Sequence, residues 1–531
     1  MTREPWGRSL IFLSPILPFL AAVVAGAAGP HKSPHPSASP DAASSAGPRA
    51  VSSSTPCVRI DSESRLHYSP FLRGDTVPDF SYCGFGGGGV PLPQVTTRQT
   101  LDPVSGSDDT ARIQAALDAV ARLPLGSDRM RGAVLLRRGT YRIAKTLRIN
   151  DEGIVLRGEG SAEDGTVLLA TGTQPRTLVE VAGEAAEKIV RRVVHYSVTD
   201  DYVPVGARSF TLDSVEGLSV GTNVIVRRPG RPKWLRLLGI DVPKDKNRIA
   251  ELAKANALSF DRVIAHIEGH KITLDAPLGC SLDAQYGGGF AMRSQFHQRI
   301  RNVGIEDLRG DCEVKGEGDA DHAQVFVGLS TVENAWVRRI AAVHFGSAAV
   351  SVGQGAQWVT VEDSACLDPA GSSGGDRCGF EIAGGQLTLI QRCTTRGVGH
   401  AFVTGMAEGP NVFLDCSAAQ AHADSGPQKH WALATLYDNV RIEGGDLIVT
   451  YRGTHPGWTG ASQLFWNCRA ETIRCDSPPT ALNWAVGCTA HHRLGDGHWE
   501  FGHVPAEPSS LYRAQLGERL GPAAVANLGG K

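Results

Sequence analysis

The chain has 531 residues, of which 53 are Lys or Arg and 55 are Asp or Glu, giving a formal net charge of −2. This balance gives no support for binding to nucleic acid or to an anionic membrane surface, both of which favour an excess of positive charge. The 62 glycines and 4 methionines fit a loop-rich β architecture better than a helical one.

The N-terminus has the pattern of a secretion signal. Arg3 and Arg8 give a basic start, and an apolar run and a group of small residues follow. We therefore expect residues 1–28 to be a signal peptide and the protein to be secreted. The alternative is a single membrane anchor, but Pro15 and Pro18 interrupt the apolar run, and a spanning helix needs about 20 apolar residues.

Residues 29–54 are rich in Pro, Ser, Ala and His, a composition that buries little apolar surface, so we expect a disordered spacer there. The N-terminal cap and the first rungs of the fold are expected over 55–196. Within them, 108–123 has the apolar periodicity of a helix, with Asp109 or Thr110 as its N-cap. Such a helix can cover the end of a strand stack whose edges would otherwise be exposed.

Short strands follow this helix, and residues 197–290 then break the pattern. Their alternating apolar residues predict a compact β unit that ends in a hairpin, with a partly helical segment at 233–258. We interpret 197–290 as a subdomain inserted between rungs of the main fold.

The main rungs are predicted over 291–490, where five short strings recur: LTLIQRCTTR, NVFLDCSAA, NVRIEGGDL, QLFWNCRAE and NWAVGCTAH. Their alignment places one small residue in a common column at intervals of 23, 28, 24 and 20 residues, namely Cys393, Cys416, Gly444, Cys468 and Cys488. Recurrence at this period indicates a solenoid, and two or three apolar residues per string suit one short buried strand. The prediction is an all-β parallel β-helix, followed by a tail over 491–531 with a closing helix at 509–521.

The chain has 11 cysteines, an odd number for a secreted protein. The four in the column are expected to be buried, unpaired packing residues. Cys366 and Cys378 flank a Gly/Ser loop and can pair, and Cys57 and Cys83 can fasten the N-terminal segment, although the sequence fixes neither disulfide. No Cys/His spacing matches a zinc site.

The strings PDFSYCGFGGGGVPLP (78–93), DDTARIQAAL, GAVLLRRGTYRI and GIVLRGEG resemble the opening of secreted pectate-lyase-like proteins, the pectin lyase fold superfamily. The resemblance covers residues 78–170 in detail and 301–490 at the level of architecture. It implies a right-handed parallel β-helix that acts on polysaccharide. Because this fold carries lyases, hydrolases, epimerases and binding proteins, the resemblance specifies the fold more than the reaction.

The sequence departs from two branches of this superfamily. The N-T-D and R-I-K motifs of polygalacturonases are absent, and Gly399-His400 is followed by Ala401 instead of a second glycine. There is no clear acidic run of the kind that binds calcium in pectate lyases. Ca²⁺ is still a candidate cofactor at residues 313–324, which hold Glu317, Asp319, Asp321 and His322; a solvated acidic turn is the alternative.

Loops that leave successive rungs place polar side chains at similar distances from the column. Because equivalent loops emerge on one flank about 4.8 Å apart, we expect these side chains to share a groove. The predicted groove residues are Arg396, His400, His422, Asp424 and Arg452, together with Lys429, His430, Trp431, Tyr437, His455 and Trp458.

These residue types suit β-elimination of a uronate-containing polysaccharide. Arginine can neutralise the C6 carboxylate, and His or Lys can remove the C5 proton and protonate O4. We predict catalytic roles for His400, His422, His430, Lys429, Arg396 and Arg452, and substrate-binding roles for Trp431, Trp458, His455, Asp424 and Tyr437. The alternative is that each histidine is a solvated loop residue without a catalytic role and that each tryptophan packs under a loop.

Two other functions are consistent with the sequence. A glycoside hydrolase needs two carboxylates about 5–5.5 Å or about 6.5–9.5 Å apart, for which Asp424 and Asp438 are the best placed, followed by Asp376. A non-catalytic carbohydrate-binding or cell-surface protein would use the solenoid as a rigid rod. In all three cases we expect a monomer with a polysaccharide as its partner.

Overall fold

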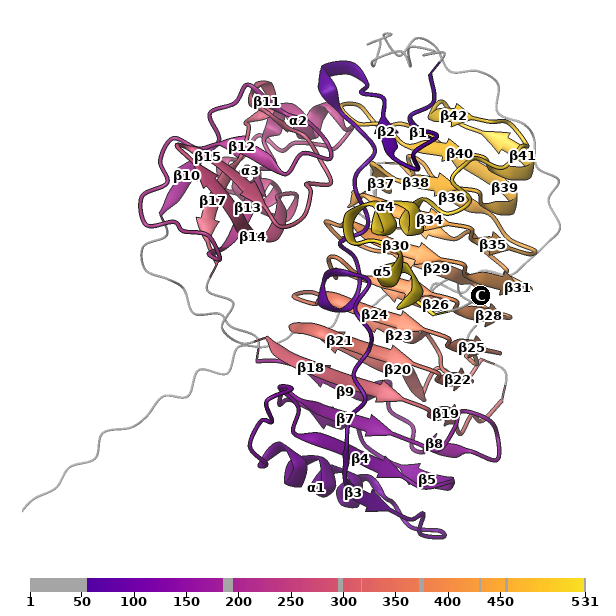
Figure 1. The fold of residues 1–531 in the computed structure, drawn as a ribbon. Coiled ribbons are helices and arrows are strands. Elements are labelled where there is room, and N and C mark those ends of the chain that lie inside the picture. The colour runs from indigo at the N-terminus through magenta and orange to yellow at the C-terminus, as the bar shows by residue number, and fades with distance from the viewer. Residues whose placement is uncertain are drawn as a thin grey trace, which may run out of the picture. The chain divides into compact units, whose positions relative to one another are not determined.

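The computed structural model describes residues 55–184, 194–294, 299–316, 318–371, 377–428, 431–453 and 457–529. These residues form a parallel β-helix, as the sequence predicts, whose three walls are long parallel sheets (Figure 1). A full turn of the solenoid contributes one strand to sheet 1, the next to sheet 2 and the next to sheet 3. The predicted signal peptide and spacer lie outside the described residues.

Sheet 1 has 12 strands: β3 (Thr97–Leu101), β4 (Gly132–Leu136), β7 (Ile154–Arg157), β18 (Ile300–Glu306), β21 (Val332–Arg338), β24 (Gln357–Glu362), β27 (Leu389–Gln391), β30 (Asn411–Leu414), β34 (Thr435–Asp438), β38 (Leu464–Trp466), β40 (Trp484–Val486) and β42 (His498–Glu500). Sheet 2 has 11: β5 (Gly139–Ile143), β8 (Thr166–Ala170), β19 (Arg309–Cys312), β22 (Ala341–Val343), β25 (Ala365–Leu367), β28 (Thr394–Arg396), β31 (Ser417–Ala419), β35 (Arg441–Ile442), β39 (Arg469–Cys475), β36 (Leu447–Val449) and β41 (Thr489–Leu494). Sheet 3 has seven: β6 (Leu147–Ile149), β9 (Arg176–Ala182), β20 (Ala323–Ser330), β23 (Ala348–Val352), β26 (Cys378–Ile382), β29 (His400–Thr404) and β32 (Gly426–Pro427).

The interior of the solenoid is a single apolar core fed by all three sheets. One run of stacked rings passes along it, with centroid separations of 6.1, 5.7, 5.1 and 5.4 Å between Phe380, Phe402, Phe413, Tyr437 and Phe465. The four column cysteines lie in the same core with at most 1% of their surface exposed, and all four are free thiols. The prediction that they are buried packing residues is confirmed.

The corner between sheets 1 and 2 explains the column. At each corner one residue adopts a left-handed conformation, with φ of 51° at Arg392, 51° at Asp415, 57° at Asn439 and 52° at Asn467. The next residue turns inward, which places Val440 in the cysteine column. The assignment of Gly444 to this column is therefore wrong: Gly444, with φ of 78°, follows β35, where the chain leaves sheet 2.

The ends of the chain cover the solenoid in two places. α1 (Thr110–Ala121) contacts β3, β4, β6 and β7 and buries Ile113, Leu117 and Val120 in the core. α4 (Leu511–Leu520), which we expected to close the stack, instead packs on the outer face of sheet 1, where Leu516 shares an apolar cluster with Trp466. α5 (Pro522–Ala526) and the hairpin of β1 (Val58–Ile60) and β2 (Leu66–Tyr68) lie over the same face (Figure 1).

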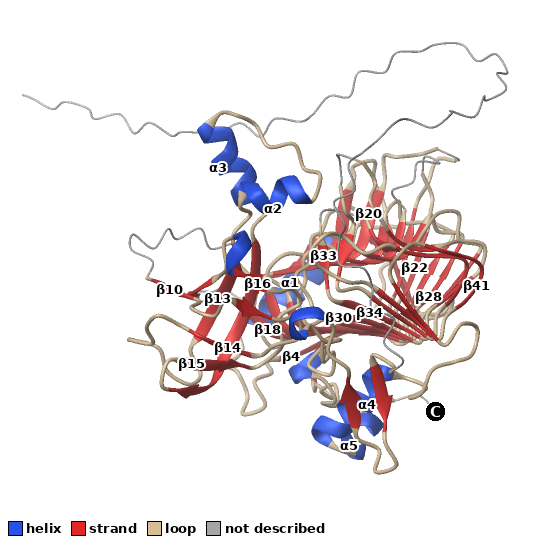
Figure 2. Ribbon diagram, turned by 90° about the horizontal axis from the view of Figure 1, so that it is seen from above, coloured by secondary structure: helices blue, strands red, loops and turns tan. Residues whose placement is uncertain are grey.

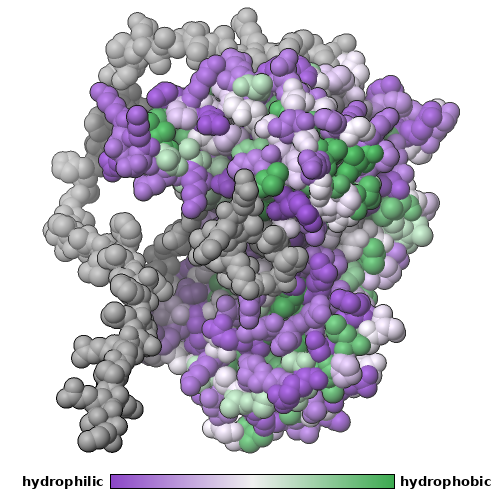
Figure 3. Space-filling view, turned by 90° about the vertical axis from the view of Figure 1, so that its left-hand side faces the viewer, coloured by the Kyte–Doolittle hydropathy of each residue, from purple (hydrophilic) through white to green (hydrophobic). Residues whose placement is uncertain are grey.

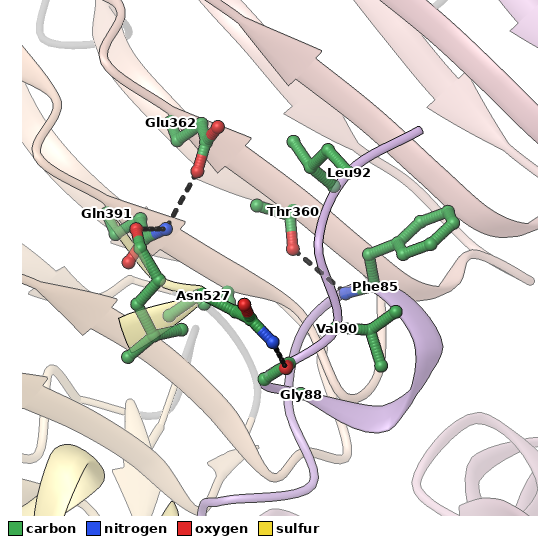
Figure 4. Close-up of a pocket in the computed structure, with 11 residues that line it drawn as sticks. Phe85, Gly88, Val90, Leu92, Thr360, Glu362, Gln391 and Asn527 are labelled. Atoms are coloured by element: carbon green, nitrogen blue, oxygen red, sulfur yellow. Dashed lines mark hydrogen bonds between the residues drawn. The ribbon is translucent and has the colours of Figure 1, made fainter. Parts of the chain in front are cut away.

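An N-terminal segment that includes Phe85 to Leu92 completes this cover. A small cavity lies between this segment and sheet 1 (Figure 4). The backbone N–H of Phe85 donates to Oγ1 of Thr360 at 2.9 Å, and the Asn527 side chain donates to the Gly89 carbonyl at 2.9 Å. Segments from the N-terminal and C-terminal parts of the described chain thus pack on the outer face of sheet 1. Cys57 and Cys83, in this region, are free thiols and do not form the disulfide considered from sequence; Cys366 is also free.

Between β9 and β18 the chain leaves the solenoid and forms an insert with an antiparallel sheet, seen beside the three walls in Figure 2. Its strands are β10 (His195–Ser197), β17 (Phe290–Arg293), β13 (Asn223–Arg228), β14 (Leu258–Glu268), β15 (Lys271–Leu274) and β12 (Ser209–Thr211), with a separate pair β11 (Tyr202–Val203) and β16 (Leu282–Asp283). Two helices follow β13: α2 (Pro232–Leu237) and α3 (Lys246–Ala255). No helix among the described residues is long and apolar enough to cross a membrane.

Candidate functional site

The corner between sheets 2 and 3 gathers polar residues from three consecutive turns of the solenoid. His400 is the first residue of β29, and Asp424 lies in the turn that leads from β31 to β32. Sheet 3 continues beyond β32 through a parallel bridge between Ser425 and Leu447, which stacks β36 on it. Arg452 follows β36 and reaches back to Asp424.

Asp424 is the centre of this cluster. Its backbone carbonyl accepts a hydrogen bond from Nδ1 of His400, and its carboxylate accepts one from Nη2 of Arg452. The side-chain amide of Gln428 also donates to the Asp424 carboxylate at 3.0 Å and to its carbonyl at 3.1 Å. Four side chains from three consecutive turns thus form one hydrogen-bonded unit, which we call the His–Asp–Arg cluster.

The partner of Nδ1 determines which nitrogen of His400 is the base. Nδ1 has two neighbours, the Asp424 carbonyl, which can only accept, and the Gln428 amide nitrogen at 3.4 Å. The carbonyl is the nearer of the two and favours the proton on Nδ1. In the neutral ring Nε2 then carries the lone pair, and it has no hydrogen-bond partner among the described residues. The side chain is 14% exposed. The geometry thus leaves a basic nitrogen that is oriented by the fold and available to a ligand.

Two aromatic rings pair across the hairpin that carries Arg452. Tyr451 and Trp458 lie on the two sides of the hairpin that carries Arg452, with ring centroids 5.5 Å apart. Tyr451 is 39% exposed and Trp458 is half-buried, so the pair offers a partly open aromatic surface beside a guanidinium. Aromatic faces of this kind suit the apolar faces of sugar rings.

Three predicted groove residues do not join the cluster. The Arg396 guanidinium binds the Asp368 carboxylate through both Nε (3.0 Å) and Nη2 (2.5 Å). His422 is exposed and makes no side-chain hydrogen bond to a described residue, although its backbone N–H donates to the Val398 carbonyl at 3.0 Å. Trp431 is only 8% exposed, because its ring packs edge-on against Trp234 of the insert at 5.4 Å.

The structure corrects the assignment of Tyr437 to substrate binding. Its ring is fully buried in the stack of the solenoid core, 5.1 Å from Phe413, so no ligand reaches it. Sheet 1 alternates inward and outward residues, and the sequence offered no sign of which face Tyr437 takes. The predicted site residues Lys429, His430 and His455 lie outside the described residues.

The carboxylate pair considered for a hydrolase is not assembled. Asp438 lies on sheet 1 under α4, where it accepts hydrogen bonds from the Ser510 hydroxyl at 2.8 Å and the Tyr512 backbone N–H at 2.9 Å. Burial raises the pKa of Asp438 to about 7. Asp424 belongs to a different corner of the solenoid, so Asp438 acts as an anchor for α4. Asp376 lies outside the described residues.

The insert borders the cluster. Gly239, just after α2, lies so close to Tyr451 that a Cβ atom on it would be 3.1 Å from the Tyr451 hydroxyl. The two bodies share an apolar cluster that includes Leu433 and Ala461 of the solenoid. Beside it, burial raises the pKa of Glu408 to about 7. Sequence reasoning missed this neighbour, because nothing in the local pattern of the insert says which rungs it contacts.

Gln428 and Tyr451 were also missed. Gln428 is four residues after Asp424, and Tyr451 is adjacent to Arg452, so proximity in sequence to predicted site residues was the available signal. Neither has the charge that drew attention to the histidines and arginines.

At 313–324 the sequence allows a calcium site but favours a solvated acidic turn. Among the described residues, no three or more His, Cys, Asp or Glu side chains are gathered so that they could hold a metal ion. The Asp319 carboxylate instead accepts hydrogen bonds from the backbone N–H of Lys315 and of Asp321, each at 2.9 Å. This is the geometry of an acidic turn; Glu317 lies outside the described residues.

The fold and the site together define a parallel β-helix protein with a His–Asp–Arg cluster at one corner of its solenoid. No known protein family and no curated protein matches the chain by sequence. Among solved structures it is similar to ORF18 of Geobacillus virus E2, with 13% identity, a TM-score of 0.33 and coverage of 75% of this chain and 57% of that one.

It is also similar to the surface adhesin PfbA of Streptococcus pneumoniae, with 11% identity, a TM-score of 0.38 and coverage of 81% and 79% of the two chains. For the polygalacturonase of Erwinia carotovora the identity is 10%, the TM-score 0.37 and the coverage 78% and 98%. At such low identities and TM-scores, none of these similarities bears on the activity of this chain.

Proposed function

We propose that the protein is a secreted enzyme that binds an acidic polysaccharide at the His–Asp–Arg cluster and cleaves it by β-elimination. One observation carries the proposal: His400, Asp424, Gln428 and Arg452, which come from three consecutive turns of the solenoid, form one connected unit. β-Elimination of a uronate chain needs a group that neutralises the carboxylate, a base and an acid; Arg452 and His400 suit the first two, and the nearby aromatic pair Tyr451 and Trp458 suits a sugar ring.

Arg452 is the group that would receive the C6 carboxylate of a uronate. Its Nη2 is bound to Asp424, which fixes the guanidinium plane, while its Nε is buried without a hydrogen-bond partner. A uronate carboxylate that binds the remaining N–H donors would gain charge-assisted hydrogen bonds. Neutralising this carboxylate makes the C5 proton easier to remove.

His400 is the group that would remove that proton. Nε2 takes the proton from C5, the C5–H electron pair forms the C4=C5 double bond, and the C4–O4 bond breaks. A proton delivered to O4 completes the step, so no water is added. Asp424 holds the His400 ring through its carbonyl and Arg452 through its carboxylate, and therefore positions both reacting groups.

The acid that protonates O4 is assigned to the segment that follows Gln428 in sequence. Lys429 and His430 have the right chemistry, and they keep the catalytic role predicted from the sequence, as His455 keeps its binding role. Arg396 and His422 are proposed to contact the chain farther along the corner, where Arg396 stays paired with Asp368.

The proposal is tested with a panel of uronate polysaccharides and the full-length protein. We expect ultraviolet absorbance from the new double bond, products without the mass of an added water, and a loss of about 10²–10⁴-fold in His400→Ala. His491→Ala is the matched control, because His491 is an exposed histidine on β41 that pairs with Glu471 at 2.6 Å. Saturated products that contain one added water would rule out the elimination, and binding without turnover would leave only a carbohydrate-binding role.

A further inference from the structure

The insert carries a basic segment whose cations are exposed. Residues 232–254, which include α2 and α3, contain six cations and three carboxylates, although the whole chain has a net charge of −2. The six cations are all exposed: Lys233, Arg236, Lys244, Lys246, Arg248 and Lys254.

None of these six cations forms an ion pair with a carboxylate of the described residues. Many arginines on the solenoid walls do the opposite and bind an acid on a neighbouring rung, as in Arg148–Glu180, Arg301–Glu333, Arg339–Asp307, Arg392–Asp363 and Arg396–Asp368. The solenoid therefore neutralises its positive charge locally, whereas the basic segment leaves its charge facing solvent.

Packing accounts for only part of α3. None of its residues is fully buried, although Leu252 is partly buried against the apolar cluster of the insert. Its N-cap is Asp245, whose carboxylate accepts hydrogen bonds from the backbone N–H of Asn247 and of Arg248 at 3.0 Å each. One of the three acids in the segment is thus used as a cap, and the helix presents three exposed cations.

The basic segment is fixed next to the His–Asp–Arg cluster. The Trp234 ring of α2 packs on Trp431, its Nε1 donates to Oγ1 of Thr480 at 3.2 Å, and Gly239 lies against Tyr451. Tyr451 in turn adjoins Arg452. Figure 3 shows that the face of the molecule that includes the insert is predominantly hydrophilic.

We infer that the basic segment is a second binding surface, which holds an acidic polysaccharide by charge as the chain leaves the His–Asp–Arg cluster. This inference rests on the proposed function for the class of polymer, a repeating polyanion with a carboxylate on alternate or successive sugars. Exposed charges are screened over about 8–10 Å at physiological salt, so the segment strengthens capture of a long polymer and contributes little to a short oligosaccharide.

The experiment compares four proteins in binding to polygalacturonate, alginate, hyaluronan and heparin at low and at physiological salt. They are the wild type, His400→Ala, a segment variant (Lys244→Gln, Lys246→Gln, Arg248→Gln and Lys254→Gln) and a control variant. The control removes four exposed, unpaired cations from other parts of the chain (Arg59→Gln, Arg98→Gln, Arg122→Gln and Lys145→Gln). Both quadruple variants change the net charge equally and touch no buried side chain.

We expect the segment variant to bind the best polymer about tenfold more weakly or worse at low salt, with a smaller salt dependence. The control variant should bind within about twofold of the wild type, and His400→Ala should not cleave the polymer, so its binding can be measured without turnover. Any of four results would overturn the inference. The two quadruple variants could lose binding equally, or the segment variant could lose none. The wild type could bind none of the four polymers, or it could bind single-stranded DNA more tightly than any of them. Normal polymer binding by a wild type that cleaves nothing would instead refute the elimination alone.

Discussion

Arg452 donates a hydrogen bond to the carboxylate of Asp424, a residue 28 positions earlier in the chain. The two side chains are 31% and 14% exposed. The stacking of rungs brings these two residues into contact. The side-chain amide of Gln428 donates a hydrogen bond to the same carboxylate. Because the pair is partly shielded from water, we expect it to stabilise the fold more than a fully exposed ion pair does.

A double-mutant cycle measures the strength of this contact. Asp424→Asn and Arg452→Gln should each lower the free energy of unfolding, and the double variant should lower it by less than the sum, with a coupling of about 1–2 kcal/mol. Urea unfolding of the four proteins gives the coupling. The exposed pair Arg396–Asp368 serves as the comparison, for which we expect less than about 1 kcal/mol. Additive effects for Asp424 and Arg452 would show that the contact does not persist in solution.

Asp438 predicts a pH dependence of stability. Its pKa is 3.8 when unperturbed and is raised by burial to about 7 in the folded protein, so the folded state binds the proton more tightly. The stabilisation from this proton is complete below about pH 4 and is lost as the pH rises to about 7, with an upper limit of about 4 kcal/mol. Asp438→Asn stays neutral and should remove this part of the decline.

The measurement is the free energy of unfolding from pH 4 to 8 for the wild type and Asp438→Asn. The difference between them should change across this range, whereas Asp164→Asn, which alters a carboxylate that is 82% exposed, should run parallel to the wild type. Parallel curves for the wild type and Asp438→Asn would mean that Asp438 is ionised in the folded protein and that α4 holds an anion at its first turn.

The sequence was sufficient for the fold and for part of the cluster. The column is visible because Cys393, Cys416, Cys468 and Cys488 share one inward position, directly after the left-handed residue of the corner. The fifth member was misplaced because the rung that contains Val440 has a less apolar strand, TLYD, and its true corner residue is Asn439. The feature that recurs in each of these rungs is a residue with a left-handed backbone conformation just before the column. This residue is Arg, Asp, Asn or Gly in different rungs.

The location of individual side chains was beyond the sequence. His400, Asp424 and Arg452 lie together, yet Arg452 is twelve residues after Val440, which is farther from the column than His400 and Asp424 are. Trp431 and Trp458 have similar local sequences, but only Trp431 is covered by Trp234 of the insert. Contacts between an insert and distant rungs leave no periodic trace in either segment.

Asn467 tests the corner geometry. It is left-handed, with φ of 52°, and its side chain donates to the Ala506 carbonyl at 3.0 Å and accepts from the Ala506 N–H at 2.7 Å. The same amide also donates to the Ser509 carbonyl at 3.2 Å. Asn467→Ala loses all three hydrogen bonds and adds strain of about 1–2 kcal/mol, whereas Asn467→Gly loses only the hydrogen bonds. We expect Asn467→Ala to be about 1 kcal/mol less stable than Asn467→Gly in thermal or urea unfolding. Equal stabilities would mean that the corner relaxes out of the left-handed region.

The hydrogen bonds of Arg262 lead to a prediction about how firmly the insert is attached to the solenoid. Its side chain is fully buried in β14, and it donates to Oε1 of Gln386 at 2.9 Å and to the carbonyls of Pro277 at 2.9 Å and Gly409 at 2.8 Å. Gln386 and Gly409 belong to the solenoid, so one guanidinium joins the two bodies. Without it these acceptors are buried and unsatisfied, at a cost of about 3–5 kcal/mol.

Limited proteolysis distinguishes loss of attachment from general unfolding. In Arg262→Ala we expect cleavage within 194–294 to accelerate while the solenoid stays protected, and polymer binding to weaken because the basic segment is no longer held beside Arg452. Lys271→Ala, which changes an exposed residue of β15 in the same insert, should resist protease like the wild type. If Arg262→Ala destabilises the insert and the solenoid together, the two bodies unfold as one unit and the apolar contact of Trp234 with Trp431 is enough to keep them joined.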